Sequence, residues 1–220
     1  MKNKLWVFGC SLSTGFRGAI MPYDEKDTWA GKLANKLGLE LVNQAHAGQC
    51  NWVSILQFID RRDEIKKGDI VVFEFTFFDR FNIYPTRAQW GDLEHFFIKH
   101  QQSLVDANKE LRDLNFKWFG KQVHQWCNDT EIPIYLWSVE GQTHIDFKRY
   151  FEKYRFIPAP NYTIESPNFS FYYKWQDLHP EQWCLEDDRH FGELGHERMA
   201  NHLFDCIKND IQYTYKKPVV

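Results

Sequence analysis

Short apolar runs separated by amphipathic segments are the feature that most limits the folds open to this chain. The run from Ile70 to Phe75 is apolar at every position except Glu74. A strand that is apolar on both sides of its pleat is typical of a parallel sheet covered by helices on both faces. The run therefore predicts a strand that is buried on both faces.

Similar runs alternate with helical patterns along the chain. Apolar runs of strand length lie at 4–8, 39–42, 70–75 and 132–137. Apolar residues at helical spacing lie at 28–37, 51–65, 92–128 (with a break near 115) and 193–211. We expect Asn51 to cap the second helix, and Trp52, Ile55, Leu56 and Ile59 to share its buried face. Strands that alternate with helices predict an α/β protein with a central parallel sheet of about four to five strands.

The length and pattern of the chain indicate one domain. A chain of 220 residues can form a single well-packed core. At about 140–185 the periodicity gives way to Pro, Asn, Tyr and Phe, over a stretch too long for a plain connection. We therefore predict a single domain over 1–220 with an irregular insertion at about 140–185.

Charge, hydropathy and cysteine usage argue against several classes of partner. A net charge of −3 provides no basic surface for nucleic acid. No apolar run approaches the roughly 20 residues of a membrane span, and no signal peptide is evident. The cysteines are odd in number and form no C-x-x-C pair, so we expect reduced thiols and a cytoplasmic location. They are Cys10, Cys50, Cys127, Cys184 and Cys206.

Residues able to carry chemistry follow the predicted strands. Ser11 follows the first strand, Gly48 follows the second, and Asp187 and His190 precede the last helix. Ligands of such sheets bind beyond the carboxyl ends of the strands. A serine hydroxyl becomes a strong nucleophile only when a base takes its proton and a carboxylate orients that base. Asp187 and His190 can supply both groups from one turn.

On these residues the chain resembles the SGNH hydrolases, the GDSL-type esterases and lipases. Members of this family have a strand that runs into Gly-Asp-Ser, a glycine after the second strand, and Asp-x-x-His before the C-terminal helix. The corresponding segments here are Gly9-Cys10-Ser11, residues 43–48 with Gly48, and residues 187–190, followed by Gly195-His196. The resemblance implies a three-layer α/β/α flavodoxin-like fold and hydrolysis of ester bonds.

The resemblance also implies roles for individual residues. Ser11 would be the nucleophile, His190 the general base and then acid, and Asp187 the carboxylate that orients His190. The backbone amides of Ser11 and Gly48 would form the oxyanion hole. No metal or organic cofactor is implied. The implied substrate is a small-molecule or carbohydrate ester, such as an O-acetyl group on a sugar.

The sequence departs from the family at two positions. Cys10 stands where the family has Asp in Gly-Asp-Ser, and Phe78 stands where it has the oxyanion-hole Asn of Gly-x-Asn-Asp. Phe78 cannot donate a hydrogen bond, and loss of one such donor typically lowers the rate by about a hundred- to a thousandfold. Thr76, Arg80 or Asn51 could substitute. Arg80 could instead bind an acidic group of the substrate.

Other residues offer competing interpretations of the site. Cys10 could itself be the nucleophile with His190 as base, although a small buried thiol fits that position better. Asp177 and His179 are a rival for the last motif, but their spacing is one residue short. His190 is therefore the better choice of base.

The residues around His190 also have alternatives. Asp188 could replace Asp187 as the partner of His190. Asp187, His190 and His196 could bind a metal, but they show no familiar zinc spacing, so no metal is predicted. His196 is better explained as a packing or capping histidine.

Two other functions fit the same residues. Because of Phe78, the fold could serve as a binding or structural module with an impaired site. The same triad could also transfer an acyl group to a sugar acceptor.

Overall fold

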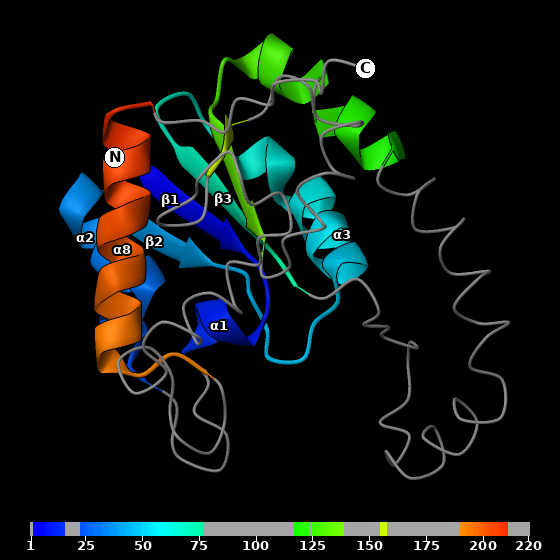
Figure 1. Ribbon diagram of the computed structural model, residues 1–220. Coiled ribbons are helices and arrows are strands. Elements are labelled where there is room, and N and C mark those ends of the chain that lie inside the picture. The colour runs from blue at the N-terminus through cyan, green and yellow to red at the C-terminus, as the bar shows by residue number, and fades with distance from the viewer. Residues whose placement is uncertain are drawn as a thin grey trace, which may run out of the picture.

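The computed structural model describes residues 2–15, 23–76, 117–123, 125–138, 155–157 and 190–210, which form a parallel sheet between two layers of helices (Figure 1). The strands are β1 (Lys4–Phe8), β2 (Glu40–Asn43), β3 (Ile70–Phe75), β4 (Ile134–Ser138) and β5 (Arg155–Phe156). The α-helices are α1 (Ser11–Thr14), α2 (Trp29–Leu37), α3 (Asn51–Arg61) and α8 (Glu193–Lys208), with 3₁₀ turns η1 (Glu25–Asp27) and η2 (Arg62–Glu64). Residues 117–123 and 125–130 are also helical.

The sheet has the strand order β2-β1-β3-β4-β5, and every neighbouring pair is parallel. From β1 the chain first adds β2 on one side and then β3 on the other side, so the direction in which strands are added reverses between β1 and β3. In sheets of this kind, ligands bind in the crevice outside the carboxyl ends of the strands at that point. The predicted parallel α/β architecture is confirmed, and the first place to look for a site is the end of β1 and β3.

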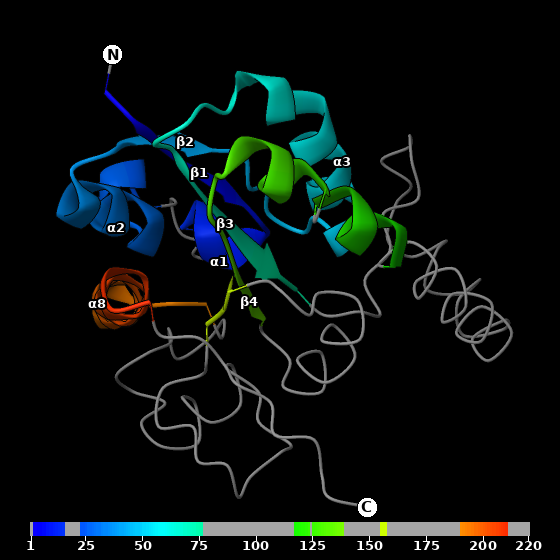
Figure 2. The ribbon, with the colours of Figure 1, turned by 90° about the horizontal axis from the view of Figure 1, so that it is seen from above.

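The two faces of the sheet form two separate cores. Along β1, Leu5 and Val7 pack with α2 and α8, whereas Trp6 and Phe8 pack with α3 and residue Phe119. Figure 2 shows α2 and α8 on one side of the sheet, and α3 with the helical residues 117–123 and 125–130 on the other. Burial of alternate residues on opposite faces explains why the strands are apolar throughout.

The predicted elements agree closely with the observed ones. The strands predicted at 4–8 and 70–75 have those bounds, and the others are shifted by one or two residues. Gly38 ends α2 in the left-handed conformation, with φ of 70°. Of the helical stretch predicted at 92–128, only residues 117–123 and 125–128 are among the described residues; they are helical, and the second run continues to 130. Most of the predicted insertion at 140–185 lies outside the described residues, although residues 155–156 within it form β5.

The prediction for α3 was wrong in three respects. The helix ends at Arg61, before η2, and its N-cap residue is Cys50 rather than Asn51. Leu56 is 46% exposed, whereas Phe58 is buried. The buried face includes the polar residues Asn51 and Ser54. Since these polar side chains have hydrogen-bond partners inside the protein, the buried stripe turns away from Leu56.

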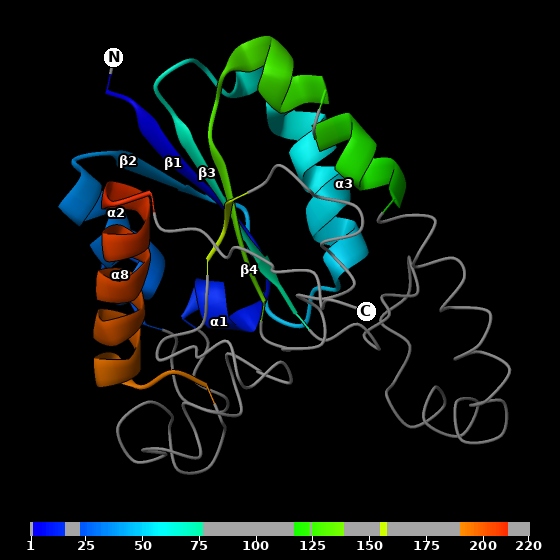
Figure 3. The same ribbon diagram turned by 45° about the horizontal axis from the view of Figure 1, so that its top comes forward.

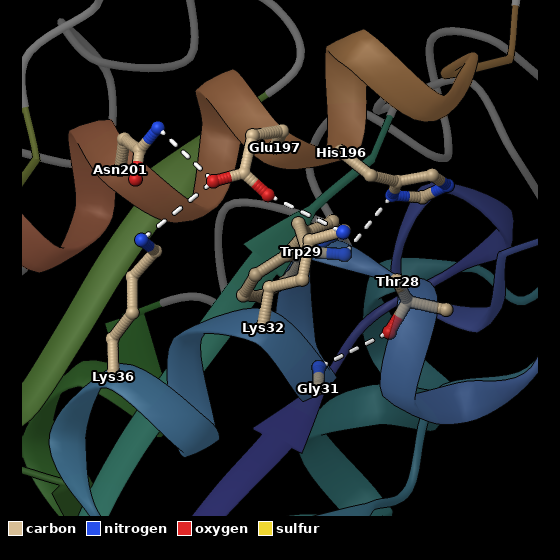
Figure 4. Close-up of polar contacts among 8 residues, drawn as sticks. All are labelled: Thr28, Trp29, Gly31, Lys32, Lys36, His196, Glu197 and Asn201. Carbon is tan, nitrogen blue, oxygen red and sulfur yellow. Dashed lines mark hydrogen bonds and ion pairs between the residues drawn. The ribbon is translucent and has the colours of Figure 1, made fainter.

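A buried histidine joins α8 to the start of α2 (Figure 4). His196 is 1% exposed, and its Nδ1 accepts a hydrogen bond of 3.0 Å from the backbone N–H of Trp29. The neighbouring N-cap residue Thr28 accepts the N–H of Gly31 at 3.1 Å. The two side chains satisfy amides at the first turn of α2 that no helical carbonyl can reach. The interpretation of His196 as a packing or capping histidine is confirmed.

Exposed ion pairs lie beside this buried contact. Glu197, one residue further along α8, pairs with Lys32 at 3.3 Å and Lys36 at 3.6 Å on α2. Its side chain is 40% exposed. Ion pairs with this degree of exposure contribute about 0–1 kcal/mol. The buried hydrogen bond of His196 should therefore matter more to stability than the ion pairs.

We expect His196→Ala to lower the free energy of unfolding by about 1–3 kcal/mol, because it leaves the buried N–H of Trp29 without its acceptor. Glu197→Ala, the control on the same helix, should lower it by less than about 1 kcal/mol. Urea unfolding followed by tryptophan fluorescence measures both values. Equal losses in the two variants would contradict this ranking.

Candidate active site

The chain leaves β1 through a glycine that passes close to β3. A Cβ atom on Gly9 would lie 2.6 Å from Cβ of Glu74 and 2.9 Å from Oγ of Ser13. Any side chain at this position would push the strand end away from β3. Gly9 therefore allows the following turn and α1 to sit directly against Glu74.

Ser11 is the first residue of α1 and is 5% exposed. Its carbonyl accepts a hydrogen bond of 3.0 Å from Oγ1 of Thr14, and its Oγ lies 3.8 Å from Sγ of Cys10. The N–H of a first helical residue has no partner within its own helix. Within the described part of the chain, no group accepts a hydrogen bond from the Ser11 amide. That amide can therefore donate to a bound oxyanion.

The second serine of the turn has a different environment. Ser13 is fully buried, and its hydroxyl donates a hydrogen bond to Oε2 of Glu74. A substrate cannot reach a fully buried hydroxyl without opening the core. Of the two serines of this turn, Ser11 is therefore the more accessible, at 5% exposed against 0% for Ser13.

Glu74 is the site residue that the sequence analysis missed. It lies on β3, is 1% exposed, and accepts hydrogen bonds from the Cys10 thiol at 2.7 Å and the Cys10 N–H at 3.2 Å. Ser13 supplies the third donor. The signal was present in the sequence, because a charged residue within a fully buried strand needs partners. It was treated there only as an exception to an apolar run.

The Cys10 thiol is held in its protonated form. Burial raises the pKa of this thiol to about 12, and the nearby charge of Glu74 is the second cause. Since the thiolate is the reactive form, Cys10 is a poor nucleophile near neutral pH. Its position as a small buried thiol beside the strand is confirmed.

Two hydrogen bonds hold the loop after β2 against the turn that follows β1. The side chain of Asn43 donates to the Ser13 carbonyl at 2.9 Å, and the N–H of His46 donates to the Gly9 carbonyl at 3.3 Å. Gly48 is exposed and has a φ of 76°, a conformation that strongly favours glycine. The loop that carries Gly48 is therefore tied to the end of β1.

Asn51 ties the start of α3 to the end of β3. Its Oδ1 accepts the N–H of Thr76 at 2.7 Å, and its Nδ2 donates to the Thr76 carbonyl at 2.9 Å. Asn51 and Thr76 are 5% and 1% exposed. These bonds occupy the Thr76 amide, whereas Nδ2 of Asn51 carries a second hydrogen.

His190 comes to the same end of the sheet as Ser11. Phe191, next to His190, and Leu12, next to Ser11, belong to one buried cluster. Figures 1 and 3 show α1 and the segment before α8 at the same end of the molecule. His190 is half-buried, and no hydrogen bond joins it to Ser11 among the described residues.

Several predicted site residues lie outside the described residues. They are Asp187 and Asp188, the rival pair Asp177 and His179, and Phe78 and Arg80. Within the described ranges, no three His, Cys, Asp or Glu side chains gather as a metal site requires. In the same ranges, no helix has the length and apolar character needed to cross a membrane.

Comparison with known proteins gives structural matches only. No protein-family model and no curated protein matches the chain. A two-domain esterase active on acetylated mannans matches at 13% identity and a TM-score of 0.55, over 99% of this chain and 53% of that one. TesA matches at 13% identity and a TM-score of 0.53, over 95% of this chain and 100% of that one. A putative lipolytic protein of the G-D-S-L family from Desulfitobacterium hafniense DCB-2 matches at 13% identity and a TM-score of 0.51, over 92% of this chain and 98% of that one.

At this level of identity the matches establish the fold alone. The chain has the three-layer α/β/α fold seen in GDSL-type lipolytic hydrolases of known structure, at a sequence identity of 13% to those named above.

Proposed function

We propose that the chain is a serine esterase that hydrolyses a small or carbohydrate ester through an acyl-enzyme on Ser11. The observation that carries the proposal is the position of Ser11. It starts a short helix at the carboxyl end of β1, where the strand order reverses, and Figures 1 and 3 show the start of α8, next to His190, at the same end of the sheet. This is where ligands bind in such sheets.

The proposed reaction has two stages. Ser11 Oγ attacks the carbonyl carbon of the ester while His190 takes the serine proton. The tetrahedral intermediate then expels the alcohol, which receives that proton from His190. In the second stage, His190 activates a water that cleaves the acyl-enzyme, and the proton returns to Ser11. Asp187 would orient His190 throughout.

The oxyanion would be held by backbone amides and one side chain. The amides of Ser11 and Gly48 are proposed as two donors. Asn51 is the better replacement for the donor missing at Phe78, since its Nδ2 carries a second hydrogen and is fixed by Thr76. The Thr76 hydroxyl is a second candidate, since it is buried and has no hydrogen-bond partner among the described residues.

The proposed substrate is a short acyl ester, such as an O-acetyl group on a sugar. One protein with this fold is active on acetylated mannans, which supports a carbohydrate ester among the options. Arg80 is proposed to bind an acidic group of the substrate. No disulfide bond joins the cysteines of the described ranges, and we propose a reducing, cytoplasmic location.

Ser11→Ala should lower kcat on a short-chain nitrophenyl ester by at least about a thousandfold, because it removes the nucleophile. A fluorophosphonate probe should label the wild type at Ser11 and leave this variant unlabelled. Thr130→Ala is the control, since it removes a hydroxyl near the start of β4, at the opposite end of the sheet. Equal turnover by wild type and Ser11→Ala would refute the esterase, and no probe labelling of the wild type would favour an impaired binding module.

Iodoacetamide at pH 7.5 should leave Cys10 unmodified and the esterase active, since burial and Glu74 hold the thiol pKa near 12. The half-buried Cys127 is the internal control and should react first. Peptide mass spectrometry of the native protein measures both. Alkylation of Cys10 with matching loss of activity would instead identify Cys10 as the nucleophile.

A further inference from the structure

Two buried carboxylates bind β3 to β1, one at each end. Asp69, just before β3, is 4% exposed and accepts hydrogen bonds from the Lys4 N–H at 2.8 Å and the Trp6 indole N–H at 3.0 Å. It also accepts the N–H of Lys66 at 3.0 Å. Glu74 is the equivalent group near the other end of β3. Asp69 thus fixes the start of β1, and Glu74 fixes the turn that follows β1.

The donors to Glu74 lie on both sides of Ser11. Cys10 precedes Ser11 and donates through its N–H and its thiol, and Ser13 follows and donates through its hydroxyl. Helix α1 has four residues. A single helical turn is too short to be stable by itself in water, so its position depends on outside contacts. Glu74 provides such contacts immediately before and after the candidate nucleophile.

We propose that Glu74 is a positioning residue of the esterase, whose buried carboxylate holds Ser11 in place through Cys10 and Ser13. The inference rests on the proposed function for its link to catalysis. Its structural part, that Glu74 fixes the turn at residues 9–15, stands on the hydrogen bonds alone.

A carboxylate suits this position better than an amide. Three donors meet the two oxygens of Glu74, and an ionised carboxylate accepts at both oxygens. Glutamine at the same place would present an NH₂ group to at least one of these donors. Glu74→Gln should therefore loosen the turn with little change in side-chain volume.

The same contact gives a physical reason for Cys10 in place of the aspartate of the Gly-Asp-Ser motif. The Cys10 thiol donates to Oε1 of Glu74 at 2.7 Å in a buried setting. An aspartate at position 10 would bring a second carboxylate against the first, and two like charges at close range disfavour each other. Cys10 and Glu74 are thus a matched donor and acceptor.

The test compares Glu74→Gln with Asp69→Asn, the same change at the other end of β3. Each protein is assayed for kcat and KM on the nitrophenyl ester and for amide hydrogen exchange by mass spectrometry. Glu74→Gln should lower kcat about 10- to 100-fold with KM nearly unchanged, because small misplacement of a reacting group has effects of this size. Exchange should accelerate in residues 9–15. Asp69→Asn should accelerate exchange near residues 4–6 and keep kcat within about threefold.

A second readout comes from moving the carboxylate from position 74 to position 10. Cys10→Asp should lower kcat more than Glu74→Gln does, because it adds a carboxylate next to Glu74. The double variant Cys10→Asp with Glu74→Gln should recover much of that loss, since the new amide can donate to the new carboxylate. Such non-additivity is expected only when two residues interact directly. Additive losses would overturn the pairing.

The remaining outcomes separate this inference from the proposed function. Unchanged exchange in residues 9–15, or equal kcat losses in Glu74→Gln and Asp69→Asn, would overturn it. If Glu74→Gln does not fold, Ser13→Ala decides: a fall in kcat at constant KM supports the inference, and an unchanged kcat overturns it. Equal turnover by wild type and Ser11→Ala would overturn the proposed function alone. Hydrogen exchange would still test whether Glu74 fixes the turn at residues 9–15, because that measurement does not depend on turnover.

Discussion

The hydrogen bonds between Glu74 and the turn after β1 connect the core of the sheet to the candidate nucleophile. Glu74 lies on a strand that is covered by helices on both faces, so its position is set by the packing of the whole domain. Cys10 and Ser13 take their positions from Glu74. Gly9 permits this contact, because any side chain there would meet Glu74. Because Cys10 and Ser13 flank Ser11, these hydrogen bonds restrict the position of Ser11 relative to the core, as a preorganised site requires.

Two other polar side chains extend this arrangement across the carboxyl end of the sheet. Asn43 at the end of β2 binds the carbonyl of Ser13, and Asn51 at the start of α3 binds the backbone of Thr76 at the end of β3. The hydrogen bond of Asn43 is part-buried, and those of Asn51 are buried. The strand ends where the site is proposed are therefore held by side chains, whereas the helices that cover the sheet are held by apolar packing.

The fold was largely predictable, because it follows from local patterns. The apolar run of β3 and the stop at Gly38 are local signals, and both appear in the structure as expected. The buried face of α3 was not predictable in detail, since Asn51 faces inward only because Thr76 is there to meet it. The role of Glu74 depends in the same way on partners more than 60 residues away in sequence. The motif around Ser11 pointed to the turn after β1, but not to Glu74, which accepts hydrogen bonds from Cys10 and Ser13 in that turn.

The central claim is that Ser11 forms a covalent acyl intermediate, and a trapping experiment tests it most directly. The wild-type protein is mixed with an activated acyl ester, quenched in acid within the first turnover and digested for mass spectrometry. The account predicts that the acyl mass appears on the peptide that contains Ser11, at Ser11 itself, and that Ser11→Ala carries none. An acyl group on Cys10, or continued turnover by Ser11→Ala, would contradict it.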